Sequence, residues 1–172
     1  MFEKLKRKYL KRQIDENLKG RDLTLRNSSL KRLGFLVDEN ILLDIETLYD
    51  FSKELQIHRK DVKIYSFREV KKKLPTLVQN QINNKDFTWR GDIDNQNATE
   101  FLDIPFDVLI GFYSGKNEFL DVMVSKSKAK FKVGFKGGDE RLYDLLMDID
   151  PNNIEGFKLE LIKYLTILNK IN

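Results

Sequence analysis

The chain has 172 residues, of which 41% are hydrophobic and 34% are charged, a composition typical of one globular domain with its own core. No run of residues approaches the length of a membrane span, and the charged N-terminus lacks the apolar stretch of a secretory signal. The absence of cysteine excludes disulfides, thiolate metal sites and cysteine nucleophiles. Together these features predict a cytoplasmic protein.

The net charge of +4 is distributed unevenly along the sequence. Residues 1–32 contain eleven Lys or Arg and four Asp or Glu, which gives this segment a net charge of +7. The other 140 residues contain 20 basic and 23 acidic side chains, a net charge of −3. A basic segment on a nearly neutral body indicates an anionic partner.

Residues 2–18 have the spacing of an amphipathic helix that ends near Gly20. The apolar positions are Phe2, Leu5, Tyr9, Leu10, Ile14 and Leu18. The candidate anion-binding residues around the remaining circumference are Lys4, Lys6, Arg7, Lys8, Lys11 and Arg12. We therefore expect residues 1–31 to form a basic helical arm and residues 32–172 to form a single α/β domain.

Four interpretations of this helix stay open. Its lysines and arginines are suited to the phosphates of RNA or of a ribonucleoprotein, because neutralising them releases counterions. A basic amphipathic helix also suits an anionic membrane surface. Alternatively, the stripe of Phe2, Leu5 and Tyr9 docks on the protein's own domain, or it pairs with another protein chain.

The residue pattern in the first half of the domain predicts two strands and a helix. Residues 33–37 form a short apolar run, and residues 61–67 alternate between apolar and polar side chains. Between them, Asp44 is a candidate helix cap. Residues 70–103 have no clear pattern apart from a short helix over residues 98–102, so we expect small elements of their own there.

The second half of the domain has the more regular pattern. Residues 107–113 are almost continuously apolar, as in a strand buried on both faces. A helix is predicted over residues 117–124, a strand over 130–135, a strand or mixed segment over 142–149, and a last helix after Pro151. This alternation predicts a Rossmann-like three-layer α/β domain with a mostly parallel sheet of four to five strands.

Lysines spaced by two residues precede and enter the predicted strand 130–135. These lysines are Lys126, Lys128, Lys130 and Lys132. On a strand, Lys130 and Lys132 share one face, where they either protect an exposed sheet edge or bind an anion.

The loop Ser114–Gly115–Lys116–Asn117 joins a predicted strand to a predicted helix. Backbone N–H groups at such a helix start are able to hold a phosphate, and a plain turn with a cap is the alternative. The chain lacks G-x-x-x-x-G-K-[ST], and G-x-G-x-x-G does not follow the first strand. Gly137–Gly138 is a similarly weak signal.

The remaining polar candidates carry no clear chemistry. Carboxylates at the ends of strands would suit Mg²⁺, but surface caps explain them equally well; they are Asp38, Glu39, Asp148 and Asp150. His58 is the only histidine, and we expect it in an exposed loop. Trp89, close to Phe87, fits a small satellite core, with base stacking as the alternative. No catalytic residue, metal site or cofactor is predicted.

Two resemblances arise from segments already described. Asp107–Ile110, Leu120 and Ala129–Phe135 resemble the N-terminal half of heptosyltransferase-type glycosyltransferases, which implies a Rossmann-like fold and a degenerate domain that binds a nucleotide sugar or small ligand. The glycine-rich loop after the first strand of those enzymes is absent here.

The second resemblance extends over nearly the whole chain and is to a small bacterial family of uncharacterised proteins. Its motifs are the basic N-terminal helix, Asp86–Trp89 with Gly91, Pro105–Ile110, Ser127–Phe135 and Tyr164–Lys170. It implies no activity. The sequence therefore favours a non-enzymatic binding protein that places its N-terminal helix on RNA or a ribonucleoprotein, with no cofactor.

Overall fold

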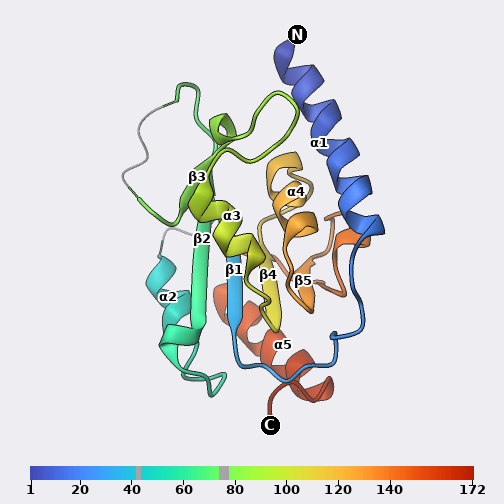
Figure 1. Ribbon diagram of the computed structural model, residues 1–172. Helices are drawn as coiled ribbons and strands as arrows, with labels where there is room; N and C mark the ends of the chain where they lie inside the picture. Colours follow the sequence, from blue (N-terminus) through green and yellow to red (C-terminus); the bar gives the residue numbers. More distant parts are fainter. Residues whose placement is uncertain (42–43, 74–77) are drawn as a thin grey trace.

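The computed structural model describes residues 1–41, 44–73 and 78–172, in which six parallel strands form one sheet with helices on both faces (Figure 1). The strands are β1 (Leu33–Asp38), β2 (Val62–Arg68), β3 (Gln81–Asn83), β4 (Val108–Phe112), β5 (Lys132–Phe135) and β6 (Leu145–Met147). Their order is β3-β2-β1-β4-β5-β6, and every neighbouring pair is parallel. This is the strand order of a Rossmann fold, which confirms the predicted fold class.

The sheet has more strands than the four to five that the sequence predicts. The unpredicted strand is β3, which has only three residues and whose single apolar side chain is Ile82. It pairs with the last residues of β2, from Ser66 to Arg68. A three-residue strand of sequence Gln-Ile-Asn has too short a pattern to be distinguished from a turn. It lies within the segment 70–103, of which residues 74–77 are outside the described residues.

Five α-helices and three short 3₁₀-helices lie in the described residues. The α-helices are α1 (Phe2–Lys19), α2 (Ile45–Asp50), α3 (Gln96–Asp103), α4 (Glu118–Lys126) and α5 (Ile154–Ile167), and the 3₁₀-helices are η1 (Arg59–Asp61), η2 (Asn84–Asp86) and η3 (Glu140–Leu142). Asp44, Asn95, Asn117 and Asn153 each accept a backbone N–H at the start of a helix. These caps define where four of the helices begin.

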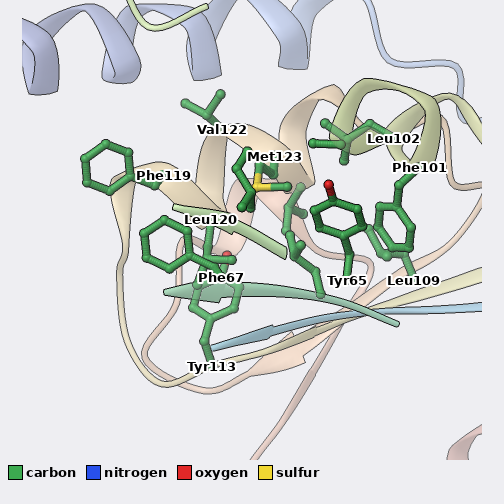
Figure 2. Packing of buried hydrophobic residues seen from close by; sticks show 14 of the residues in the cluster. Tyr65, Phe67, Phe101, Leu102, Leu109, Tyr113, Phe119, Leu120, Val122 and Met123 are labelled. Atoms are coloured by element: carbon green, nitrogen blue, oxygen red, sulfur yellow. The ribbon is translucent and has the colours of Figure 1, made fainter. Parts of the chain in front are cut away.

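Alternating side chains of the strands fill two separate cores. On one face, Leu36, Tyr65 and Leu109 pack with residues of α3 and α4, as Figure 2 shows for Tyr65 and Leu109. On the other face, Phe35 and Ile110 pack with α2 and α5. Because successive side chains of a strand point to opposite faces, both sides of the central strands must be apolar, as their sequences are.

Helix α1 forms an additional layer that packs on α4 (Figure 1). Its Leu10 and Ile14 are 0% and 4% exposed and belong to the same core as α3 and α4. The interpretation that this helix docks on the protein's own domain is confirmed, but the stripe of residues expected to make the contact is wrong, because Phe2 remains 80% exposed and Leu5 39% exposed. The docked face instead follows residues 6, 10 and 14, which are one helical turn apart.

The segment that follows α1 is also attached to the domain. Arg21 donates to both carboxylate oxygens of Asp144, with Nη1 and Oδ1 3.2 Å apart. Near its end, Leu30 N–H donates to the carbonyl oxygen of Lys170 at 2.8 Å, and Lys170 Nζ donates to the carbonyl oxygen of Ser28 at 3.2 Å.

Among the described residues, no helix combines the length and the apolar character needed to cross a bilayer.

The docking of α1 can be tested by stability. We expect Leu10→Ala to lower the free energy of unfolding by about 2–5 kcal/mol, because it removes a fully buried side chain from a packed core. Leu5→Ala, on the same helix but partly exposed, is the matched control and should cost less than about 1 kcal/mol. Urea unfolding measures both, and equal small effects would mean that α1 is not part of the cooperative fold.

Candidate functional site

The inner face of α1 engages two of the predicted anion-binding residues within the protein. Lys6 is buried, and its Nζ donates to the carbonyl oxygen of Asn84 at 2.7 Å. Burial lowers the pKa of Lys6. Arg7 Nη1 donates to Glu118 Oε2 at 2.7 Å, and its Nη2 lies 3.8 Å from Glu69. Lys6 and Arg7 therefore attach the helix to the domain.

The outer face of α1 brings the other four predicted residues together. Lys4, Lys8, Lys11 and Arg12 are all exposed. Their spacing of three or four residues places them on neighbouring positions of one helical surface. Arg12 Nε lies 3.2 Å from Glu16 Oε1, and because both side chains are exposed this ion pair is weak and replaceable. We call these four residues the basic face of α1.

Residues from the connection after β2 extend the positive charge beyond α1. Lys71, Lys72 and Lys73 are exposed and directly follow Val70. Val70 exchanges two hydrogen bonds with the side chain of Asn84, and the backbone carbonyl oxygen of Asn84 accepts a hydrogen bond from Lys6 Nζ. This arrangement keeps the start of the lysine run near the N-terminal part of α1. This proximity could not be predicted from the sequence, since about 65 residues separate the two segments.

A tight turn beside α1 presents an aromatic side chain. Gly91 N–H donates to the carbonyl oxygen of Thr88 at 2.9 Å, so that Trp89 and Arg90 occupy the tip of the turn. Trp89 is 49% exposed, and the Arg90 guanidinium carbon lies 4.8 Å from the centroid of its ring. The ring of Tyr9, on α1, meets Trp89 edge to face at a centroid distance of 5.6 Å.

The expectation of a small satellite core at Phe87 and Trp89 is wrong, because Phe87 belongs to the same core as α3 and α4. Phe87 is 3% exposed and lies 5.1 Å from the ring of Phe119, centroid to centroid. For Trp89 the expectation is wrong, because the turn carries its side chain to the surface beside α1.

The second set of predicted lysines does not form an exposed face. Lys132 is 1% exposed, and its Nζ donates to the carbonyl oxygen of Val124 at 2.5 Å. Lys130 Nζ lies 2.9 Å from Asp107 Oδ1. The interpretation as edge protection is wrong, because β5 lies inside the sheet between β4 and β6.

The loop after β4 lies at the carboxyl end of the sheet. Ser114 and Lys116 are exposed, and Gly115 has a φ of +64°, a conformation that favours glycine. Asn117 Oδ1 accepts the N–H groups of Phe119 and Leu120 at 3.1 and 3.2 Å. The first turn of α4 is thus capped by its own chain, which fits the turn-and-cap interpretation.

The carboxylates at the ends of strands have partners within the protein. Glu39 accepts from Ser66 Oγ at 2.9 Å and from Gln81 Nε2, and Asp148 lies 3.1 Å from Lys136 Nζ. Asp38 and Asp150 accept backbone N–H groups two residues further along. In the parts of the chain that the structure describes, no three His, Cys, Asp or Glu side chains gather in a way that would hold a metal ion.

A buried network that the sequence did not predict lies behind the loop after β4. Tyr143 OH donates to Tyr113 OH and Tyr113 OH donates to Asp121 Oδ1, both at 2.6 Å. Burial raises the pKa of Asp121 to about 6 and that of Tyr113 well above its usual value. Tyr113 and Asp121 are 3% and 4% exposed, whereas Tyr143, at the outer end of the network, is partly exposed.

A groove of about 810 Å³ lies between the end of α1, α3 and the segment that joins α4 to β5. Its charged lining residues are Glu16, Arg21, Asp22, Asp92, Asp103, Lys126 and Lys128. Lys128 Nζ and Asp103 Oδ1 lie 3.1 Å apart. This mixture of signs does not continue the basic face of α1.

Comparison with known proteins gives a family and no activity. A family model described as "Family of unknown function (DUF6913)" matches residues 6–168. No curated protein and no solved structure matches the chain. Nothing in these comparisons links it to heptosyltransferases.

The buried Lys132 predicts a pH dependence of stability. Burial, followed by the charge of Arg21, lowers its pKa from 10.5 to about 7 in the folded state. Between these values the unfolded chain binds more protons at Lys132 than the folded chain does, so its contribution to stability rises with pH. We expect Lys132→Met to be more stable than the parent at pH 7, and this advantage should shrink steadily up to pH 9 and vanish only near pH 10.5.

Urea unfolding of both proteins at pH 7, 8 and 9 measures this difference. Lys136→Met, at an exposed position of the same segment, is the control and should give parallel curves. A constant difference between Lys132→Met and the parent would show that the ammonium group is not desolvated.

Proposed function

The chain belongs to the family of unknown function DUF6913, and we propose that it binds RNA, free or within a ribonucleoprotein, through the basic face of α1 and without catalysing a reaction. The observation that carries the proposal is the exposure of Lys4, Lys8, Lys11 and Arg12 on a helix that is fixed by its opposite side. Exposed cations that are not bound to carboxylates of the core are available to phosphates.

The docking of α1 favours a polyanion over a membrane surface. A helix that lies in a bilayer interface must insert its apolar face among the lipids. Here Leu10 and Ile14 are buried against the domain, and the exposed apolar side chains of α1 are confined to its first turns, at Phe2 and Leu5. The exposed surface is therefore predominantly cationic, which suits the closely spaced phosphates of RNA.

Removing the charges of the basic face tests the proposal. We expect the triple variant Lys4→Gln, Lys8→Gln, Lys11→Gln to bind RNA roughly 10- to 100-fold more weakly at about 0.1 M salt, because three phosphate contacts are lost. The slope of log K against log salt should become shallower by about 2. Fluorescence anisotropy of a labelled RNA across a salt series measures both quantities.

A matched control variant has the same net charge as the triple variant of α1 but leaves the basic face intact. The variant Lys53→Gln, Lys60→Gln, Lys163→Gln removes three exposed lysines from α5 and from the surroundings of α2. It should retain the parent affinity. If both triple variants lose the same RNA affinity, the loss comes from the change in net charge alone. If both variants and the parent bind RNA equally well, the basic face is not the RNA site.

A second candidate function is favoured by the strand order. The order reverses between β1 and β4, and ligands of such sheets bind beyond the carboxyl ends of the strands at this point, where Ser114–Lys116 lie. This position at the carboxyl end of β4 supports a small-ligand site for a nucleotide or nucleotide sugar.

Thermal unfolding distinguishes the second candidate from the first. A nucleotide sugar present at about 100 times its dissociation constant should raise the melting temperature by about 5–10 °C. Lys116→Ala should abolish that shift, whereas the triple variant of α1 should keep it. A panel of nucleotides and nucleotide sugars that produces no shift would count against this site and leave the RNA proposal untouched.

A further inference from the structure

We infer that the turn Thr88–Gly91 is a stacking subsite for an unpaired nucleobase, so that the ligand of the basic face is single-stranded RNA. This inference rests on the proposed function and specifies its ligand. It is carried by the exposure of Trp89 and by the way the turn is fastened beside α1.

The turn is held in place by the same helix that carries the basic face. Gln13 Nε2 donates to the carbonyl oxygen of Arg90 at 3.0 Å and to Asp92 Oδ1 at 3.1 Å. Gly91 has a φ of +83° and lies against Leu10, whose Cδ2 would be 3.1 Å from an added Cβ. The close approach and the conformation both favour glycine here, and they fix the tip of the turn relative to α1.

The backbone of the turn is closed on itself as well. Thr88 N–H donates to the carbonyl oxygen of Asp92 at 2.8 Å, and Phe87 and Ile93 form an antiparallel bridge below it. Phe87 is buried at the base, whereas Trp89 is half exposed at the tip. The turn therefore does not need the indole for its own core, and it presents the ring to solvent in a fixed position.

The groups around the indole are those that stack on bases. Tyr9 stands nearly perpendicular to Trp89, with an interplanar angle of 87°, and the Arg90 guanidinium lies over the indole. Aromatic rings and the planar guanidinium both accept an unpaired base by stacking. A duplex keeps its bases stacked internally, so its bases are not available to this surface.

The subsite and the basic face are continuous on α1. Tyr9 contacts Trp89 and is preceded in the sequence by Lys8, and Arg12 lies three residues further along the helix. Residues three apart are neighbours on a helix surface. A strand with one base on Trp89 would therefore have its adjoining phosphates within the region of Lys8 and Arg12, as in other proteins that combine a cationic groove with aromatic platforms.

Because Trp89 is the only tryptophan of the chain, its fluorescence reports directly on this subsite. The experiment titrates the full-length protein with single-stranded oligoadenylate and with the oligoadenylate–oligouridylate duplex of the same length. Tryptophan emission reports stacking, and the anisotropy of the same labelled RNA reports binding. We expect single strands to bind more tightly than the duplex and to quench Trp89.

Two variants separate stacking from folding. Trp89→Leu should weaken the binding of single strands about 5- to 100-fold while changing duplex binding little, since it removes the aromatic face. Trp89→Phe keeps an aromatic ring and should retain most of the affinity. Circular dichroism should show both variants folded, because the side chain is half exposed.

Each outcome is decisive. RNA binding without quenching, with Trp89→Leu equal to the parent, would overturn the stacking subsite and leave the proposed function standing. Equal affinity for duplex and single strand would overturn the single-strand preference. No anisotropy change with any RNA would overturn both, and a blue shift of Trp89 with anionic lipid vesicles in that case would point to a membrane surface instead.

Discussion

The attachment of α1 is the constraint on which the rest of this surface depends. Leu10 and Ile14 are buried, and Lys6 donates to the carbonyl oxygen of Asn84. The side chain of the same Asn84 exchanges two hydrogen bonds with the backbone of Val70. One face of one helix therefore positions the lysines of its opposite face, the start of the lysine run after β2 and, through Gln13, the turn that carries Trp89.

Buried charges elsewhere tie the ends of the strands together. Asp107 accepts the N–H groups of Lys31 and Arg32 at 3.0 and 2.8 Å and also pairs with Lys130, so it joins the beginnings of β1, β4 and β5. The hydrogen bonds of its carboxylate lower the pKa of Asp107 although burial alone would raise it. A buried carboxylate with three donors is satisfied, whereas one without them would be strongly destabilising.

The sequence predicts the fold well in segments whose residues are almost all apolar and buried. It predicts the fold less well in segments whose position depends on polar contacts. The apolar run at 107–113 and the Asp44 cap became β4 and the start of α2. Periodicity could not identify β3, nor show that Lys6 and Lys132 are buried, since lysine usually indicates solvent. For the candidate site, the residue types on α1 were predictable, but the neighbourhood of Trp89 and α1 was not, because it depends on contacts about 80 residues apart in the chain.

A basic helix that is docked differs physically from one that is free. A free arm would have to be ordered when it binds, and this cost would reduce its affinity for any anion. Here the backbone of α1 is already fixed by its buried face, so only the long side chains of Lys4, Lys8 and Lys11 lose freedom on contact. Gln13 also holds the turn that carries Trp89 beside α1, so the proposed stacking subsite and the basic face are presented together to a single-stranded RNA without prior ordering of either.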